Sequence, residues 1–430
     1  MRRLSIVFCS LAIVFLLLTA CVKEKEEASE MGSLENIEGV WEGTIDTPNQ
    51  PIPIIIEFGL DKGKISIPVQ GVSNYPLTNV KLNESDVFFS MNIQGQNLTF
   101  NGKVEQENIT GTFTQQGQAF PFKLVKGSKE EEVEKDRLIE VKVEDGTMSG
   151  QLEIPKGEGP FPLMVIIAGS GPTDRNGNSI ALPGKNNSLK MLAEELAGNG
   201  IATIRYDKRG VGINTSLAGG EEDLRFDQYI NDATAWVQFA KSDERFSKVG
   251  VIGHSEGSLI GMVASHKADA DTFISIAGAG RPIDQILLEQ LQAQLPENLL
   301  EESTNILEKL KQGEQVKTVS QELQSVFRLS VQPYMISWLQ YDPAEQLQKL
   351  TGSVLIVNGN LDIQVSVKDA ELLHQAKEDS DLLIVDKMNH VLKEAPADRE
   401  GNIAAYSNPD LPLAEGLIDG IVSFLQAHVK

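Results

Sequence analysis

The chain has 430 residues, enough for two or three domains. With 61 acidic and 38 basic residues its formal charge is −23, so we expect neither nucleic acid nor an anionic membrane surface as an electrostatic partner. No histidines or carboxylates have metal-ligand spacing, and the glycine-rich loops lack a Walker lysine or a dinucleotide fingerprint. We therefore expect no metal and no cofactor.

Residues 1–20 have the pattern of an export signal, because two arginines precede an apolar run too short to span a bilayer comfortably. The run closes on Leu18-Thr19-Ala20-Cys21, which resembles a bacterial lipobox, where the cysteine is lipidated after cleavage. This predicts an extracytoplasmic protein, anchored in a bacterial membrane through Cys21, with 21–36 as a polar tether. The alternatives are an uncleaved anchor and an ordinary secretory signal, which would give a secreted protein.

Residues 37–127 alternate apolar and polar side chains between closely spaced turn signals. Candidate strands lie at 39–47, 52–59, 64–69, 77–82, 86–93, 97–104, 108–115 and 118–125. The pattern predicts a small antiparallel barrel or sandwich, which we interpret as a structural or docking module, with ligand or wall binding as the alternative. A charged linker is expected over 128–136.

From residue 137 to 430, strands and helices alternate, which predicts a mostly parallel sheet with helices on both faces. The expected strands are 137–143, 148–154, 163–168, 202–206, 249–252, 272–276, 354–358 and 382–386. The expected helices are 188–198, 226–241, 255–267, 367–377 and 413–428. The first two strands precede any helix and should form an antiparallel hairpin. Ligands of such sheets bind beyond the carboxyl ends of the strands.

The alternation stops between residues 281 and 350, where leucines recur at helical spacing. This predicts a helical insertion after the sixth strand. Placed over the carboxyl ends of the strands, it would act as a cap that excludes water and shapes an acyl pocket. The alternative is a set of helices that adds to the core and gates nothing.

A Gly-x-Ser-x-Gly motif is centred on Ser255, between a predicted buried strand and a predicted helix. That context is typical of a nucleophile elbow, in which a strained turn exposes the serine hydroxyl. Gly253 and Gly257 would flank it because a Cβ there would collide with a neighbouring strand or helix. The N-terminus of the helix would favour negative charge developing at the site.

A nucleophilic serine needs a base, and the base needs an acid to orient it. Of the five histidines, only His390 lies in a loop after a strand. His254 lies in the elbow itself. The other three lie in or at the ends of predicted helices: His266, His374 and His428. We predict His390 as the base and Asp362, in the loop after strand 354–358, as the acid. Three aspartates compete for the acid role: Asp342, Asp369 and Asp386.

The chain order Ser255, Asp362, His390 resembles that of α/β-hydrolases. Residues 137–430 are similar to bacterial carboxylesterases with an N-terminal β-rich domain, and more distantly to serine aminopeptidase-like hydrolases. Three segments carry the resemblance: Ala-Gly-Ser-Gly-Pro-Thr-Asp-Arg-Asn-Gly-Asn at 168–178, Tyr-Asp-Lys-Arg-Gly-Val-Gly at 206–212, and Gly-Asn-Leu-Asp-Ile-Gln-Val at 359–365. One departure is Ala168, where many relatives have histidine in a supporting position.

In such a fold the oxyanion hole would combine the backbone N–H of Glu256 with that of Ser170, with Gly171 in reserve. We expect the Glu256 side chain to favour the helix N-terminus, or alternatively to position a substrate. The loop at 207–212 should buttress the site, with Arg209 in an internal ion pair.

These features predict a carboxylesterase that cleaves small or short-acyl esters through an acyl-enzyme. An amidase or aminopeptidase of the same fold would use the same residues. A third hypothesis is a surface-anchored binding lipoprotein with a vestigial hydrolase domain.

Overall fold

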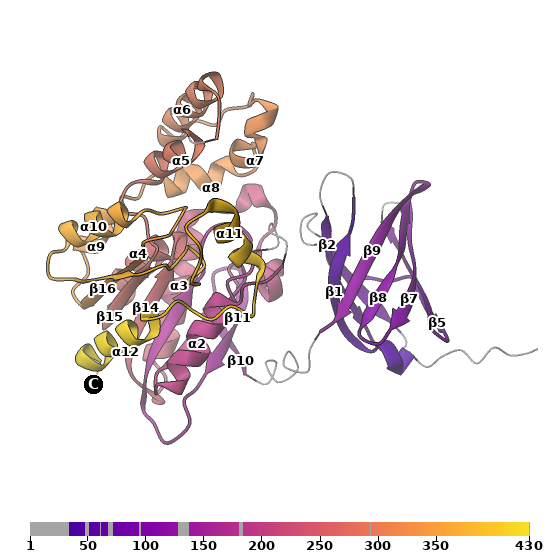
Figure 1. The fold of residues 1–430 in the computed structure, drawn as a ribbon, viewed down its shortest axis with the longest axis horizontal. Coiled ribbons are helices and arrows are strands. Elements are labelled where there is room, and N and C mark those ends of the chain that lie inside the picture. The colour runs from indigo at the N-terminus through magenta and orange to yellow at the C-terminus, as the bar shows by residue number, and fades with distance from the viewer. Residues whose placement is uncertain are drawn as a thin grey trace, which may run out of the picture.

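The computed structural model describes residues 34–47, 51–60, 62–67, 72–93, 96–127, 137–179, 184–292 and 294–429. The predicted export signal, Cys21 and the charged linker at 128–136 lie outside these residues. In the described part, no helix is both long and apolar enough to cross a bilayer. We call residues 34–127 the β domain and residues 137–429 the C-terminal domain (Figure 1).

The β domain is a curved antiparallel sheet preceded by η1 (Leu34–Ile37). Its strands are β1 (Gly39–Ile45), β2 (Ile52–Phe58), β3 (Gly63–Ile67), β4 (Val72–Pro76), β5 (Asn79–Asn83), β6 (Asp86–Ile93), β7 (Gln96–Glu105), β8 (Asn108–Gln115) and β9 (Gln118–Lys126). The order is β4-β3-β2-β1-β9-β8-β7-β6-β5, and among the described residues no pairing closes β4 onto β5. The predicted barrel or sandwich is thus observed as a half-barrel.

The core of the β domain combines aliphatic side chains with a group of packed aromatic rings. Trp41, Phe89, Phe100 and Phe122 are essentially buried, and the rings of Phe89 and Phe100 stack with centroids 4.5 Å apart. Because side chains alternate between the two faces of a strand, every second residue reaches this core. The prediction missed β4 because its sequence, Val-Ser-Asn-Tyr-Pro, lacks a clear apolar alternation.

The C-terminal domain is built on a second sheet with the order β10-β11-β13-β12-β14-β15-β16-β17. Its strands are β10 (Leu138–Val143), β11 (Gly146–Glu153), β12 (Phe161–Ile167), β13 (Ala202–Tyr206), β14 (Phe246–His254), β15 (Thr272–Ile276), β16 (Ser353–Gly359) and β17 (Asp381–Val385). The pairs β10–β11 and β11–β13 are antiparallel and the other pairs are parallel. The predicted leading hairpin and parallel sheet are confirmed.

Helices cover both faces of this sheet, which explains why strands such as β13 and β15 are buried along their whole length. On one face lie α2 (Ser188–Gly198) and α12 (Leu417–His428). On the other lie α3 (Phe226–Lys241), α4 (Glu256–Ala268) and α10 (Val367–Ala376). The sequence did not predict α11 (Arg399–Ala404), nor the short turns η3 (Gly212–Leu217), η4 (Glu221–Asp223) and η6 (Ala405–Ser407).

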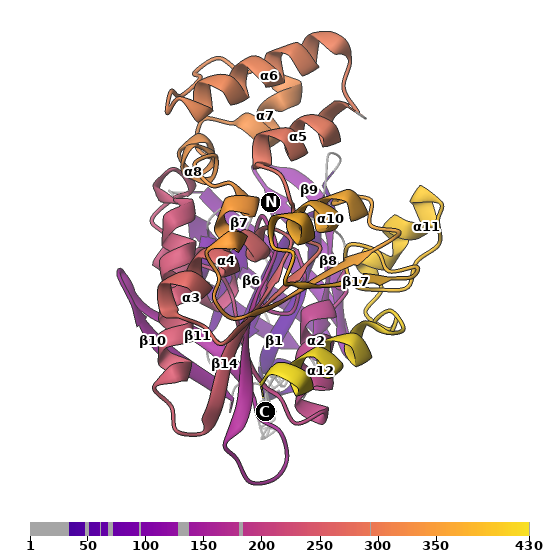
Figure 2. The same cartoon turned by 90° about the vertical axis from the view of Figure 1, so that its left-hand side faces the viewer.

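Between β15 and β16 the chain forms the predicted helical insertion, which we call the cap. It contains α5 (Ile283–Gln292), α6 (Glu297–Lys311), η5 (Gln321–Leu323), α7 (Gln324–Phe327), α8 (Gln332–Trp338) and α9 (Pro343–Gln348). Figures 1 and 2 show α5 to α8 beyond one end of the sheet. The cap has a small apolar core of its own around Leu310 and Phe327.

Aromatic side chains of the cap pack against the start of α3. The ring of Phe226 stacks on Trp338 with centroids 5.5 Å apart and meets Tyr334 edge-on at 6.0 Å. The backbone N–H of Phe226 also donates to the hydroxyl of Ser337 at 2.8 Å. This contact joins α8 to the body of the domain.

Phe226→Ala should therefore destabilise the C-terminal domain. Phe226 is fully buried, and truncating a buried phenylalanine costs about 3–5 kcal/mol, because a cavity is left where the ring was. Urea unfolding measures the loss. As a control, Ile154→Ala removes a side chain that is 42% exposed and should cost less than about 1 kcal/mol. Equal losses in the two variants would contradict this packing.

Candidate active site

Ser255 lies at the turn between β14 and α4, with φ 55° and ψ −120°. A residue with a side chain adopts positive φ only at a cost of order 1–3 kcal/mol, so the surrounding packing must impose this conformation. Its backbone N–H donates to the carbonyl of Ile276 at 2.9 Å, which ties the turn to β15.

The two flanking glycines supply that packing. A Cβ on Gly253 would lie 2.3 Å from the carbonyl oxygen of Gly257, at the start of α4. A Cβ on Gly257 would lie 2.4 Å from the carbonyl oxygen of Ile167, at the end of β12. Both distances are shorter than any real contact, so strand, turn and helix approach as closely as the predicted elbow requires.

His390 and Asp362 lie together, as the sequence predicted. The Nδ1 of His390 is 2.8 Å from Oδ2 of Asp362, and both side chains are buried. The other oxygen, Oδ1, accepts from the backbone N–H groups of Gln364 and Val365 at 2.7 and 2.9 Å. The carboxylate is therefore fixed by its own loop before it meets the imidazole.

His254 links this pair to the elbow. Its Nε2 is 2.8 Å from the carbonyl oxygen of His390, and the two rings are 4.9 Å apart between centroids. Burial, and then the nearby His390, lower the pKa of His254 to about 4. The ring is therefore neutral at neutral pH, and Nε2 donates to that carbonyl. Since His254 directly precedes Ser255, the imidazole of His390 lies beside the elbow.

Within the described residues no hydrogen bond joins the Ser255 hydroxyl to His390. Such bonds are often long before a substrate binds. The competing aspartates have other partners. Asp342 caps α9, Asp369 pairs with Arg281 at 2.8 Å, and Asp386 accepts from Asn360 at 2.7 Å.

The loop after β12 passes directly against Ser255. A Cβ on Gly169 would lie 3.2 Å from Cβ of Ser255 and 3.3 Å from Nδ1 of His254. The next residue, Ser170, is the predicted second oxyanion donor, and no acceptor for its N–H is found in the described part of the chain. The N–H of Glu256 opens α4 and so has no intrahelical partner. The two predicted donors thus belong to segments that meet at Ser255.

The Glu256 side chain has a role that the sequence analysis missed. Its Oε1 is 3.0 Å from Nζ of Lys208, and both side chains are 2% exposed. The same Nζ donates to the carbonyl oxygen of Gly169 at 2.5 Å. The partners expected for Glu256 were the helix N-terminus or a substrate. Lys208 follows a different strand, so no local pattern in the sequence indicates this pairing.

Comparison with known proteins agrees with this geometry. A family profile described as "Serine aminopeptidase, S33" matches residues 185–393. Esterase EstD of Thermotoga maritima is 31% identical over 254 residues, which are 57% of this chain and 58% of EstD. The match therefore spans little more than half of that relative.

Solved structures of esterases are also similar. Est1E from Butyrivibrio proteoclasticus, bound to ferulic acid, has a TM-score of 0.44 at 16% identity, over 68% of this chain and 99% of Est1E. A thermophilic esterase from Thermogutta terrifontis has a TM-score of 0.42 at 16% identity, over 68% of this chain and 99% of that one.

The strand order and the elbow decide the fold. The C-terminal domain has the α/β-hydrolase fold. The fold expected from the sequence is thereby confirmed.

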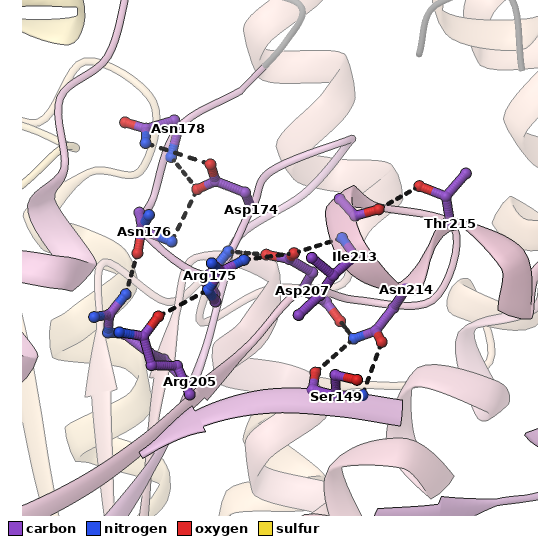
Figure 3. Close-up of polar contacts among 12 residues, drawn as sticks. Ser149, Asp174, Arg175, Asn176, Asn178, Arg205, Asp207, Ile213, Asn214 and Thr215 are labelled. Carbon is purple, nitrogen blue, oxygen red and sulfur yellow. Dashed lines mark hydrogen bonds and ion pairs between the residues drawn. The ribbon is translucent and has the colours of Figure 1, made fainter. Parts of the chain in front are cut away.

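In this α/β-hydrolase domain, a polar network holds the loops that surround the site (Figure 3). Asp207 follows β13 and is 1% exposed. It accepts from the backbone N–H and the guanidinium of Arg175 at 2.7 and 2.9 Å, and from the N–H of Ile213 at 2.9 Å. The side chain of Asn214 bonds both backbone groups of Ser149 in β11 at 2.8 Å. The loops after β12 and β13 are therefore fixed to each other and to the sheet.

Arg209 forms the predicted internal ion pair. Its guanidinium lies 2.8 Å from Asp232 of α3 and 2.5 Å from Asp145. Two surface hollows are separate from the site: one of about 540 Å³ on the cap beside α6, and one of about 320 Å³ beside Arg209. Neither is lined by Ser255, His390 or Asp362.

The network also predicts a pH dependence through Asp174. Its Oδ1 accepts from the N–H groups of Asn176 and Asn178 at 2.8 and 2.9 Å. Burial, and then the charge of Asp207, raise its pKa from 3.8 to about 6. The protonated form is thus favoured by folding. The stability it contributes is fully present below pH 3.8 and is lost as the pH rises through about 6.

Between pH 5 and 7, the wild type should therefore lose about 1 kcal/mol of unfolding free energy that Asp174→Asn does not lose, because the variant cannot titrate. Urea unfolding of both proteins at the two pH values measures the difference. An identical pH dependence in the two proteins would show that Asp174 titrates normally in the fold.

Proposed function

We propose that this chain is a serine esterase that hydrolyses small or short-acyl carboxylic esters. Ser255 is the nucleophile, His390 the general base and Asp362 the acid that orients it. The observation that carries the proposal is the buried hydrogen bond between His390 and Asp362, beside a serine held at positive φ. The similarity to EstD, whose name states esterase activity, supports the same reaction class.

The position of the proton on the His390 ring supports this assignment of roles. If Nδ1 of His390 donates to Asp362, Nε2 is left as the free acceptor. It takes the proton of the Ser255 hydroxyl as the oxygen attacks the acyl carbon, and the N–H groups of Glu256 and Ser170 stabilise the oxyanion. His390 then protonates the departing alcohol. Water, deprotonated by the same nitrogen, releases the acid and restores Ser255.

Ser255→Ala and Asp362→Asn test the triad on an activated short-acyl ester. We expect kcat to fall by several orders of magnitude for Ser255→Ala. For Asp362→Asn we expect about 10³–10⁴-fold, because the amide holds the wrong tautomer of the imidazole. The matched control is Asp386→Asn. Asp386 directly follows β17, and this variant should retain activity. Near wild-type turnover in either triad variant would refute the mechanism.

A substrate panel tests the bond that is cleaved. The family profile is described for aminopeptidases, so amides are the specific alternative. We expect kcat/KM to be higher for short-acyl nitrophenyl esters than for aminoacyl nitroanilides, whose leaving groups are the matched phenol and aniline. The reverse order would make the chain an amidase of the same fold. A fluorophosphonate that fails to label Ser255 would instead favour the binding-lipoprotein hypothesis.

A further inference from the structure

Lys208 holds one peptide plane next to the nucleophile. Its Nζ donates to the carbonyl oxygen of Gly169, and the amide of the same peptide unit belongs to Ser170. In a trans peptide the C=O and the N–H point in opposite directions within one rigid plane. Fixing the Gly169 oxygen on Lys208 therefore fixes the direction of the Ser170 N–H.

Glu256 connects this peptide to the other predicted donor. Its carboxylate is the counter-ion of Lys208, and its own backbone N–H opens α4 beside Ser255. Lys208 also lies over the ring of Tyr229, with Nζ 5.2 Å from the centroid. The pair is thus enclosed by protein, where a charge-assisted bond is not weakened by water.

We propose that Lys208 and the carboxylate of Glu256 are positioning residues for the oxyanion hole, which they set by locking the Gly169–Ser170 peptide. Ser170, rather than Gly171, is then the second donor. This inference rests on the proposed esterase function. Glu256 then has two roles. Its backbone N–H donates to the oxyanion, and its carboxylate holds Lys208, which orients the N–H of Ser170.

A role in stability alone makes a different prediction. Replacing a buried ion pair by apolar residues of similar volume is often neutral or stabilising, whereas removing one partner strands a buried charge. The double variant Lys208→Met/Glu256→Leu therefore separates the two roles. It keeps the volume of the pair and the N–H of residue 256, and it removes the donor to Gly169.

The experiment compares the double variant with wild type on a short-acyl ester. We expect a comparable melting temperature, a kcat lower by about 10–100-fold, and a KM within about threefold, because a misaligned donor is felt mainly in the transition state. Affinity for a trifluoromethyl ketone, which forms an oxyanion on a serine nucleophile, should fall by the same factor as kcat/KM. The control Asp369→Asn breaks a buried ion pair outside this loop, with Arg281, and should leave kcat within about threefold.

A folded double variant whose kcat and ketone affinity stay within about threefold of wild type would overturn the inference. If the double variant does not fold, Lys208→Met/Glu256→Gln, which removes the donor and leaves no buried charge unpaired, is held to the same thresholds. The proposed function fails separately, when Ser255→Ala still turns over the ester. An inactive Ser255→Ala beside a fully active double variant would reject only the role of Lys208 and Glu256.

Discussion

Close backbone contact around Ser255 is the constraint on which the site depends. The carbonyl oxygens of Ile167 and Gly257 occupy the space that side chains on the two flanking glycines would need. Because β12, β14 and α4 approach so closely, the turn has no relaxed alternative and Ser255 retains its positive φ. The same contact brings the carboxyl end of β12 to Ser255. The packing of these three elements therefore positions both Ser255 and the loop that carries Ser170.

Charged groups buried around the site organise loops more than they add stability. A buried ion pair often contributes little net free energy, since desolvation offsets the attraction. Asp207, Lys208 and Arg209 follow one strand in succession and have three different targets: the loop after β12, the Glu256 carboxylate and α3. One short segment thereby contacts three elements of the domain: the loop after β12, the start of α4 and α3.

Much of the fold and the site could be predicted because their signals are local. Ser255 sits in a short motif, and His390 was isolated by elimination among few histidines. Asp362 needed only a buried strand before its loop. The pairing of Lys208 with Glu256 left no such signal, because the residues are 48 positions apart. They meet only because β13 and β14 both pair with β12. This pairing order cannot be read from a short stretch of sequence.

The position of the cap has an evolutionary consequence. The chain leaves the sheet after β15 and returns at β16, and these two strands are parallel neighbours. An inserted module of any length can therefore be grafted at this junction while the sheet keeps its register. α8 packs on α3 through Trp338, and α5 bonds to the loop after β16 through Gln290 and Gln364, so α6 is the helix with most freedom to diverge. Exchanging that helix would change the surface of the cap without rebuilding the segments that carry Ser255, Asp362 and His390.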